Sequence, residues 1–150
     1  MLITIAHADI EQLDILVPLF DAYREFYGRP TECAAARAFL SKRLSNGDSH
    51  ILLAVDEAGA GLGFAQLYPS FSSVAMQRVW ILNDLFVVPE FRQHGIGRLL
   101  LLAAANVGKA TDAVRIDLAT AKDNFAAKSL YESIGYELDT AFDHYKFHIH

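Results

Sequence analysis

The first third of the chain begins with one short stretch of alternating apolar residues, and apolar residues then recur at helical spacing. Residues 2–6 alternate as a strand does. A helix follows, which Asp9 can cap and which Gly28 brings to an end. Its apolar face is formed by Leu13, Leu16, Val17 and Phe20. Thr31 can cap a second helix, which ends near Gly47.

The middle of the chain has the short apolar runs of a sheet. Residues 50–56 and 62–68 flank a connection that contains glycine, which predicts an antiparallel hairpin. Residues 68–73 mix turn formers with aromatic residues, so we expect a loop there. The next run, residues 79–88, is apolar on both faces, as in a strand from the interior of a sheet.

Two polar residues interrupt this central strand. Successive side chains of a strand alternate, so Asn83 and Asp84 should point to opposite faces. A buried carboxylate without partners is strongly disfavoured. We therefore expect Asp84, if buried, to have hydrogen-bond donors beside it.

The last third of the chain predicts one helix and three strands. Residues 114–120 form a strand, a helix follows Asn124 and ends near Gly135, and two strands cover residues 136–139 and 144–149. Three histidines share one face of the last strand, His144, His148 and His150. A solvated polar face explains that alternation without metal ligation, so we expect no metal site.

The order of elements is typical of one mixed α/β domain. With a helix after Gly97, it reads strand, two helices, three strands, helix, strand, helix, two strands. The length of 150 residues suits a single domain spanning 1–150.

Composition and charge narrow the function classes. A net charge of −5 argues against general binding to nucleic acid, which rests on cationic contacts to phosphate. No apolar run is long enough to span a bilayer, and we expect a cytoplasmic protein. Cys33 is the only cysteine, so the chain has no internal disulfide.

The loop after the central strand favours anion binding. Gly95 and Gly97 bring no side chain, which leaves main-chain N–H groups bare at the start of a leucine-rich helix. Helix starts attract phosphates through such donors and through the helix dipole. Arg92, His94 and Arg98 would add side-chain donors.

Two motifs, in this order, resemble those of the GNAT superfamily of acetyl-CoA-dependent N-acetyltransferases. Residues 92–97 fit Arg/Gln-x-x-Gly-x-Gly/Ala, the pyrophosphate loop of that superfamily. Residues 122–136 are similar to its Asn-x-x-Ala-x-x-x-Tyr-x-x-x-Gly-Phe/Tyr segment. The central strand resembles the small histone- and polyamine-acetylating branch. The resemblance implies a GNAT fold of about seven strands and about four helices, with a splayed cleft between the fourth and fifth strands.

The resemblance also implies the residues that hold acetyl-CoA. Pantetheine would pair with main-chain groups of the central strand, and the pyrophosphate would meet the glycine loop and the helix after it. The residues expected to bind the cofactor are Leu85, Phe86, Val87, Val88, Gln93, His94, Gly95, Ile96, Gly97, Arg98, Asn124, Ala127 and Tyr131.

Acetyl transfer to an amine needs a base, an oxyanion donor and an acid for the thiolate. By analogy, the main-chain N–H of Phe86 or Val87 is the oxyanion donor, and Tyr131 is the catalytic acid. Asn83 stands where polyamine enzymes often have a glutamate, so Asp84 is the nearest catalytic base. Asp84 would act through water, or it would instead hold a neighbouring loop. Glu25 is a weaker candidate.

The expected acceptor is a primary amine, such as a polyamine, an amino acid or a lysine side chain. The residues expected to line its site are Tyr23, Glu25, Tyr27, Tyr68, Phe71 and Asn83. The alternative is a CoA-binding sensor or accessory domain with little turnover. The last strand also suggests a homodimer, because small relatives often pair or swap it.

Overall fold

The structure is a computed structural model that describes residues 1–150. The chain divides into two compact parts, Met1–Ala119 and Thr120–His150, and each is described by itself. None of its helices has the length and apolar character that a membrane crossing requires.

The first part is a five-stranded sheet in the order β1-β2-β3-β4-β5. Its strands are β1 (Thr4–His7), β2 (His50–Val55), β3 (Gly61–Ser72), β4 (Gln77–Val87) and β5 (Arg115–Leu118). The first four strands pair antiparallel, and β4 pairs parallel with β5. This confirms the mixed α/β class.

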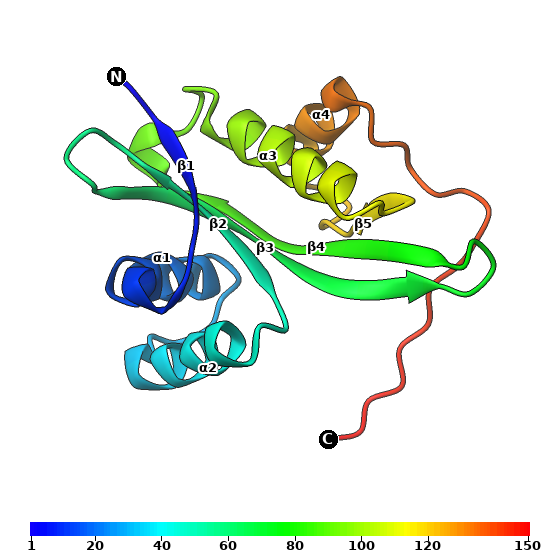
Figure 1. Ribbon diagram of the computed structural model, residues 1–150, viewed down its shortest axis with the longest axis horizontal. Coiled ribbons are helices and arrows are strands. Elements are labelled where there is room, and N and C mark those ends of the chain that lie inside the picture. Colours follow the sequence, from blue (N-terminus) through cyan, green and yellow to red (C-terminus); the bar gives the residue numbers. More distant parts are fainter. The chain divides into compact units, whose positions relative to one another are not determined.

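Helices cover both faces of this sheet (Figure 1). The 3₁₀ turn η1 (Ile10–Gln12) leads into α1 (Leu13–Phe26), and α2 (Cys33–Asn46) packs beside α1 on the same face. On the other face lies α3 (Ile96–Ala110), which follows the 3₁₀ turn η2 (Pro89–Phe91). The core under α1 and α2 includes Leu16, Val17, Phe20, Leu40, Ile51, Leu53, Phe64 and Phe86.

Of the two caps expected at the starts of the first helices, one is formed and the other is not. Asp9 caps η1, since its carboxylate accepts the N–H of Glu11 at 2.8 Å. Thr31 does not cap α2, because its hydroxyl donates to Glu25 instead. The buried carboxylate of Asp21, on α1, instead holds the residue before α2 by accepting the N–H of Glu32 at 3.0 Å.

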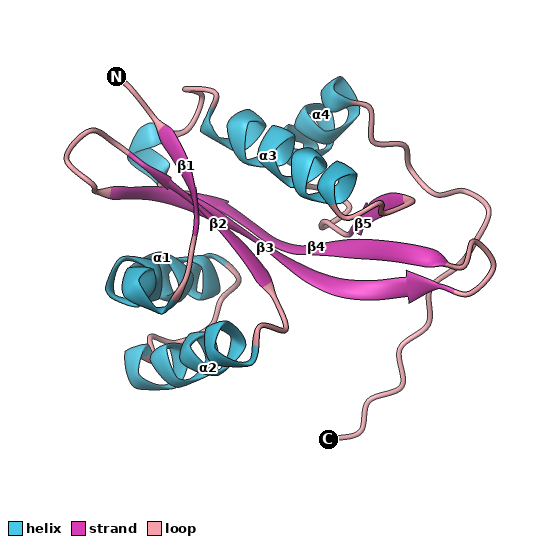
Figure 2. Ribbon diagram, in the orientation of Figure 1, coloured by secondary structure: helices cyan, strands magenta, loops and turns pink.

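The expected loop at 68–73 is wrong, because β3 runs on to Ser72 and the turn to β4 comes after it. Figure 2 shows β3 and β4 extending together as a long ribbon. Strand β2 pairs with β3 only as far as Leu67, so Pro69 lies where one edge of β3 is free. A proline's missing N–H is tolerated on such an edge, which is why the turn formers do not end the strand.

The second part consists of α4 (Phe125–Ile134) and a segment without helix or strand. Asn124 caps α4 and Gly135 ends it with a positive φ of 118°. The expected strands at 136–139 and 144–149 are not formed, so the sheet has five strands and not about seven. Alternation predicts which side chains would share a face, but a strand also needs a partner for its main-chain groups, and an isolated hairpin is only marginally stable.

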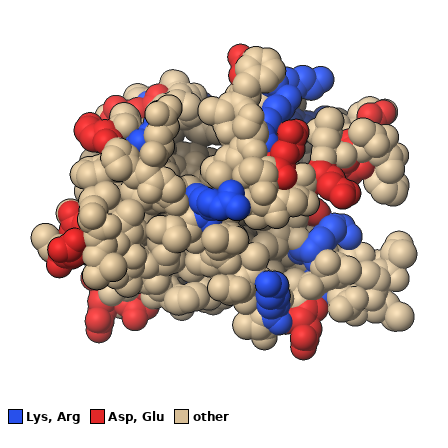
Figure 3. All heavy atoms as spheres, turned by 90° about the horizontal axis from the view of Figure 1, so that it is seen from above, with Lys and Arg blue, Asp and Glu red and all other residues tan.

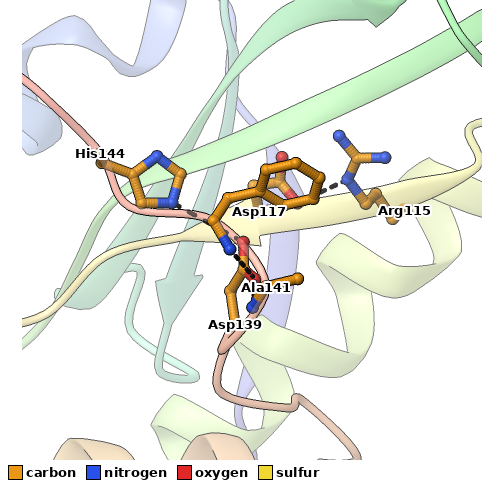
Figure 4. A network of polar contacts seen from close by, with 6 residues as sticks. Arg115, Asp117, Asp139, Ala141 and His144 are labelled. Carbon is orange, nitrogen blue, oxygen red and sulfur yellow. Dashed lines mark hydrogen bonds and ion pairs between the residues drawn. The ribbon is translucent and has the colours of Figure 1, made fainter.

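The chain forms a local turn between those two expected strands. The carboxylate of Asp139 accepts the N–H of Ala141 at 2.9 Å, and His144 Nε2 lies 3.7 Å from the same carboxyl group (Figure 4).

Figure 4 also shows the ion pair of the β5 residues Arg115 and Asp117, whose Nε and Oδ1 are 2.8 Å apart. On the face drawn in Figure 3, basic and acidic side chains are interspersed.

Candidate functional site

The pairing between β4 and β5 stops halfway along β4. The register runs from Val79 opposite Arg115 to Leu82 opposite Leu118, where β5 ends. Residues 83–87 of β4 continue without a partner on that side. Their edge therefore offers main-chain donors and acceptors.

Alternation decides which groups of β4 face this open edge. The N–H of Val88 donates to Leu62 O at 2.9 Å, so Val88 faces β3. In an antiparallel ladder every second residue bonds to the same neighbour, so Phe86 also faces β3, while Leu85 and Val87 face the open edge. Of the four residues expected to meet pantetheine, the main-chain groups of Leu85 and Val87 are the ones directed there.

The glycine loop leads from this strand to an N-terminus that no side chain caps. Gln93 and Gly95 have positive φ of 65° and 81°, and Gly95 is the N-cap of α3. Since glycine supplies no side-chain acceptor, the first turn keeps the positive end of its dipole open to an anion. Ile96 is only 1% exposed, so its main chain, not its side chain, is the part that can bind a ligand.

Arg92 packs against the end of α1 and against β4. Its Nε donates to Val87 O at 2.9 Å, and its guanidinium lies 5.3 Å from the Phe26 ring centre and 5.6 Å from that of Phe86. Nearby, His94 Nδ1 lies 2.9 Å from the carbonyl oxygen of Arg92. The side chain of Arg92 thus fixes the strand end from which the loop departs.

The structure brings Tyr23, Tyr27 and Asn83 together beside β4. The ring centres of Tyr23 and Tyr27 are 5.1 Å apart, and the Tyr23 hydroxyl donates to Asn83 O at 3.5 Å. Phe71 does not join them, because it pairs with Arg78 near the far end of the ribbon. Glu25 is exposed and accepts a hydrogen bond from Thr31.

A buried polar network lies next to this aromatic group. Asp84 is 4% exposed, and its two oxygens accept from Gln66 Nε2 at 2.7 Å and from Asn83 Nδ2 at 3.0 Å. Burial, followed by the negative charge of Asp84, raises the pKa of Tyr68 to about 12. Gln66 was missed by the sequence reasoning. Its signal was a lone amide in an apolar strand, opposite Asp84 in the hairpin register.

The second part carries the remaining three expected residues. Asn124 Oδ1 accepts the N–H of Ala127 at 3.2 Å, which makes both residues part of the α4 cap. Tyr131 lies on the same helix, with its ring centre 5.9 Å from that of Tyr136. Across residues 1–150, no group of three or more histidine, cysteine, aspartate or glutamate side chains is arranged to hold a metal ion.

In comparisons with known proteins, this chain matches acetyltransferases. The model of the acetyltransferase (GNAT) family matches residues 16–136. The uncharacterized N-acetyltransferase YhfO of Bacillus subtilis (strain 168) is 51% identical over 130 residues, 87% of each chain. A probable acetyltransferase of Haemophilus influenzae is 34% identical over 127 residues, 85% of each chain.

Solved structures agree. The crystal structure of a probable acetyltransferase is 46% identical, with a TM-score of 0.94 over 98% of each chain. The structure of AAC(6')-Iy in complex with a CoA bisubstrate analogue is 21% identical, with a TM-score of 0.81 over 99% of each chain, and shows a shared fold.

Proposed function

The chain belongs to the acetyltransferase (GNAT) family and is an acetyl-CoA-dependent N-acetyltransferase, and from this premise we propose that its acceptor is a primary amine. The acceptor would be a polyamine, an amino acid or a lysine side chain. The observation that carries the proposal is the placement of Tyr23, Asn83 and Asp84 together at the stretch of β4 that β5 leaves unpaired. The adjoining rings of Tyr23 and Tyr27 suit an amine that is cationic in solution, because ring faces attract cations.

The residues of the first part fit the acetyl donor. The main-chain groups of Leu85 and Val87 suit the amides of pantetheine, because both face the open edge of β4. The start of α3 suits the pyrophosphate, because its N-cap is a glycine with positive φ. We therefore propose that the segment from Gln93 to Arg98 binds the pyrophosphate.

The proposed reaction is direct attack in a ternary complex. The neutral amine nitrogen attacks the thioester carbonyl carbon, the C–S bond breaks, and the products are the amide, a thiolate and the proton that leaves the nitrogen. The N–H of Val87 stabilises the oxyanion, since it faces the open edge whereas that of Phe86 faces β3. Tyr131 then gives a proton to the sulfur, a role that rests on its place in the α4 motif.

The amine must lose a proton before it attacks, because a lysine-type amine has a pKa near ~10.4. Asp84 has two candidate roles here, a base acting through water or a group that holds its neighbours in place. The proposal itself requires only that the amine reach the site in its neutral form.

We propose that the protein is a homodimer and that it acts in the cytoplasm. Support for the dimer comes from the last residues, in which Tyr145, Phe147 and Ile149 are exposed at alternate positions. Sedimentation analysis should find a dimer that becomes monomeric when residues 137–150 are removed. A monomeric full-length chain would contradict the dimer.

An acceptor panel tests the proposed function. The protein is mixed with acetyl-CoA and with polyamines, amino acids, aminoglycosides or a lysine-containing peptide, and thiol release is followed beside calorimetric CoA binding. We expect amine-dependent release and intersecting initial-rate lines, as for a ternary complex. Tight CoA binding without release from any amine would favour the alternative, a sensor domain with little turnover.

A further inference from the structure

The buried network at β4 links three side chains in a fixed direction. Gln66, which is fully buried, donates through Nε2 to Asp84 Oδ2 at 2.7 Å. Asn83, which is exposed, donates through Nδ2 to Asp84 Oδ1 at 3.0 Å. The network therefore runs from the core of the sheet, through one carboxyl group, to a side chain at the surface.

A break in the strand register makes this arrangement possible. Gln66 lies opposite Asp84 and Leu67 lies opposite Leu82, so Asn83 is the extra residue of a bulge. Regular alternation would have sent Asn83 and Asp84 to opposite faces. The bulge instead turns the Asn83 amide towards the Asp84 carboxyl, while the Tyr23 hydroxyl donates to the Asn83 carbonyl oxygen.

These hydrogen bonds limit what Asp84 and Asn83 can each do in the reaction. Both oxygens of Asp84 already accept an amide hydrogen, which makes the carboxyl a poor first receiver for the proton of the amine. Asn83 must present its Nδ2 to Asp84, so its Oδ1 is the atom left to accept a hydrogen bond. A neutral amine that attacks with its lone pair still carries N–H groups to donate.

We propose that Asn83 Oδ1 binds an N–H of the attacking amine, and that Asp84, held by Gln66, is the positioning residue that orients the Asn83 amide. The inference rests on the proposed function and decides between the two roles left for Asp84. The inference also explains how an asparagine can serve at position 83: its side chain binds the amine and does not have to accept a proton from it.

The Asp84→Asn variant separates the two roles. The Gln66 amide can flip, because its Oε1 has no hydrogen-bond partner and can then accept from the new Nδ2, while the remaining oxygen still accepts from Asn83. We expect kcat and the KM for the amine to stay within about threefold of wild type, because the network is rebuilt. A base at this position would instead lose on the order of 100-fold in kcat on the same change.

Two further variants remove the network or its end. Asp84→Ala leaves both amides without an acceptor, and Asn83→Ala, at an exposed position, removes the proposed contact with little risk to folding. Both should raise the KM for the amine about tenfold, the loss of one hydrogen bond, and leave the KM for acetyl-CoA unchanged. Asp14→Asn, at an exposed residue at the start of α1, is the matched control and should change neither constant.

The outcomes distinguish this inference from the function on which it rests. Wild type without amine-dependent thiol release overturns both. An active wild type with an inactive but CoA-binding Asp84→Asn variant overturns the positioning role alone, and so does an Asn83→Ala variant with an unchanged KM for the amine. The rescue by asparagine at position 84, combined with a loss in amine KM for both alanine variants, is the expected result.

Discussion

Replacing Gly95 by aspartate should weaken CoA binding through charge, and the structure allows the charge to be isolated. Gly95 has a φ of 81°, and a Cβ added there would have nothing within 4 Å, so the cost to the fold is backbone strain and not collision. Strain of about 1–2 kcal/mol is expected for an ordinary residue in this region, and less for Asp and Asn. Asparagine has the same shape as aspartate and is therefore the reference for the charge.

The size of the effect follows from Coulomb's law. A carboxylate about 6 Å from a phosphate charge, at an effective dielectric of about 40, costs about 1.4 kcal/mol, which is about tenfold in Kd. The two phosphates of the pyrophosphate bring the expected difference between Gly95→Asp and Gly95→Asn to between about 10-fold and about 100-fold.

Calorimetric titration with CoA measures that difference, which should shrink as salt is added because salt screens exposed charges. Gly59→Asp is the backbone control. Gly59 has a φ of 83° and equally open surroundings, but it lies in the turn between β2 and β3. It should lower stability in the same way and leave CoA affinity unchanged. Equal CoA affinity of Gly95→Asp and Gly95→Asn would refute an anion site at the start of α3.

Three other changes test different parts of the account. Tyr131→Phe should lower kcat about 100-fold with CoA binding kept, and equal turnover at saturating substrate would assign Tyr131 to packing alone. Gly63→Ala should cost about 1–3 kcal/mol in urea unfolding, because its Cβ would lie 2.5 Å from Phe86 O; an unchanged midpoint would contradict that close approach. Burial, and then the neighbouring His7, lower the pKa of His50, so the unfolded chain binds the proton more strongly. The free energy of unfolding should therefore fall as pH drops below about 6.5, and fall less in His50→Gln.

The sequence predicted the elements whose signals are local. The apolar face of α1, the Asp9 cap of η1 and the glycine that starts α3 follow from spacing and residue type alone. Short continuous apolar runs also located β2 and the centre of β4.

Features that depend on pairing could not be predicted in this way. Pro69 looked like part of a loop, because its place on a free edge of β3 is known only from the register. The start of α2 is held by Asp21, eleven residues before Glu32, so no nearby pattern reveals this contact. The bulge at Asn83 likewise depends on how β3 and β4 align, and with it the contact between Asn83 and Asp84.

Residues 144–149 illustrate the reverse error. Their alternation is as clear as that of β1, but the structure gives their main-chain groups no ladder. A pattern of side chains indicates the two faces of a strand, whereas the strand itself requires a neighbour.

The central claim, acetyl transfer from acetyl-CoA to the nitrogen of a primary amine, is tested most directly by counting both products of one reaction. Mass spectrometry would quantify the acetylated amine while a thiol reagent quantifies free CoA. The account predicts equal amounts of the two, with the acetyl group on nitrogen and neither product formed when the amine is left out. Free thiol without acetylated amine, or neither product with any primary amine, would contradict it.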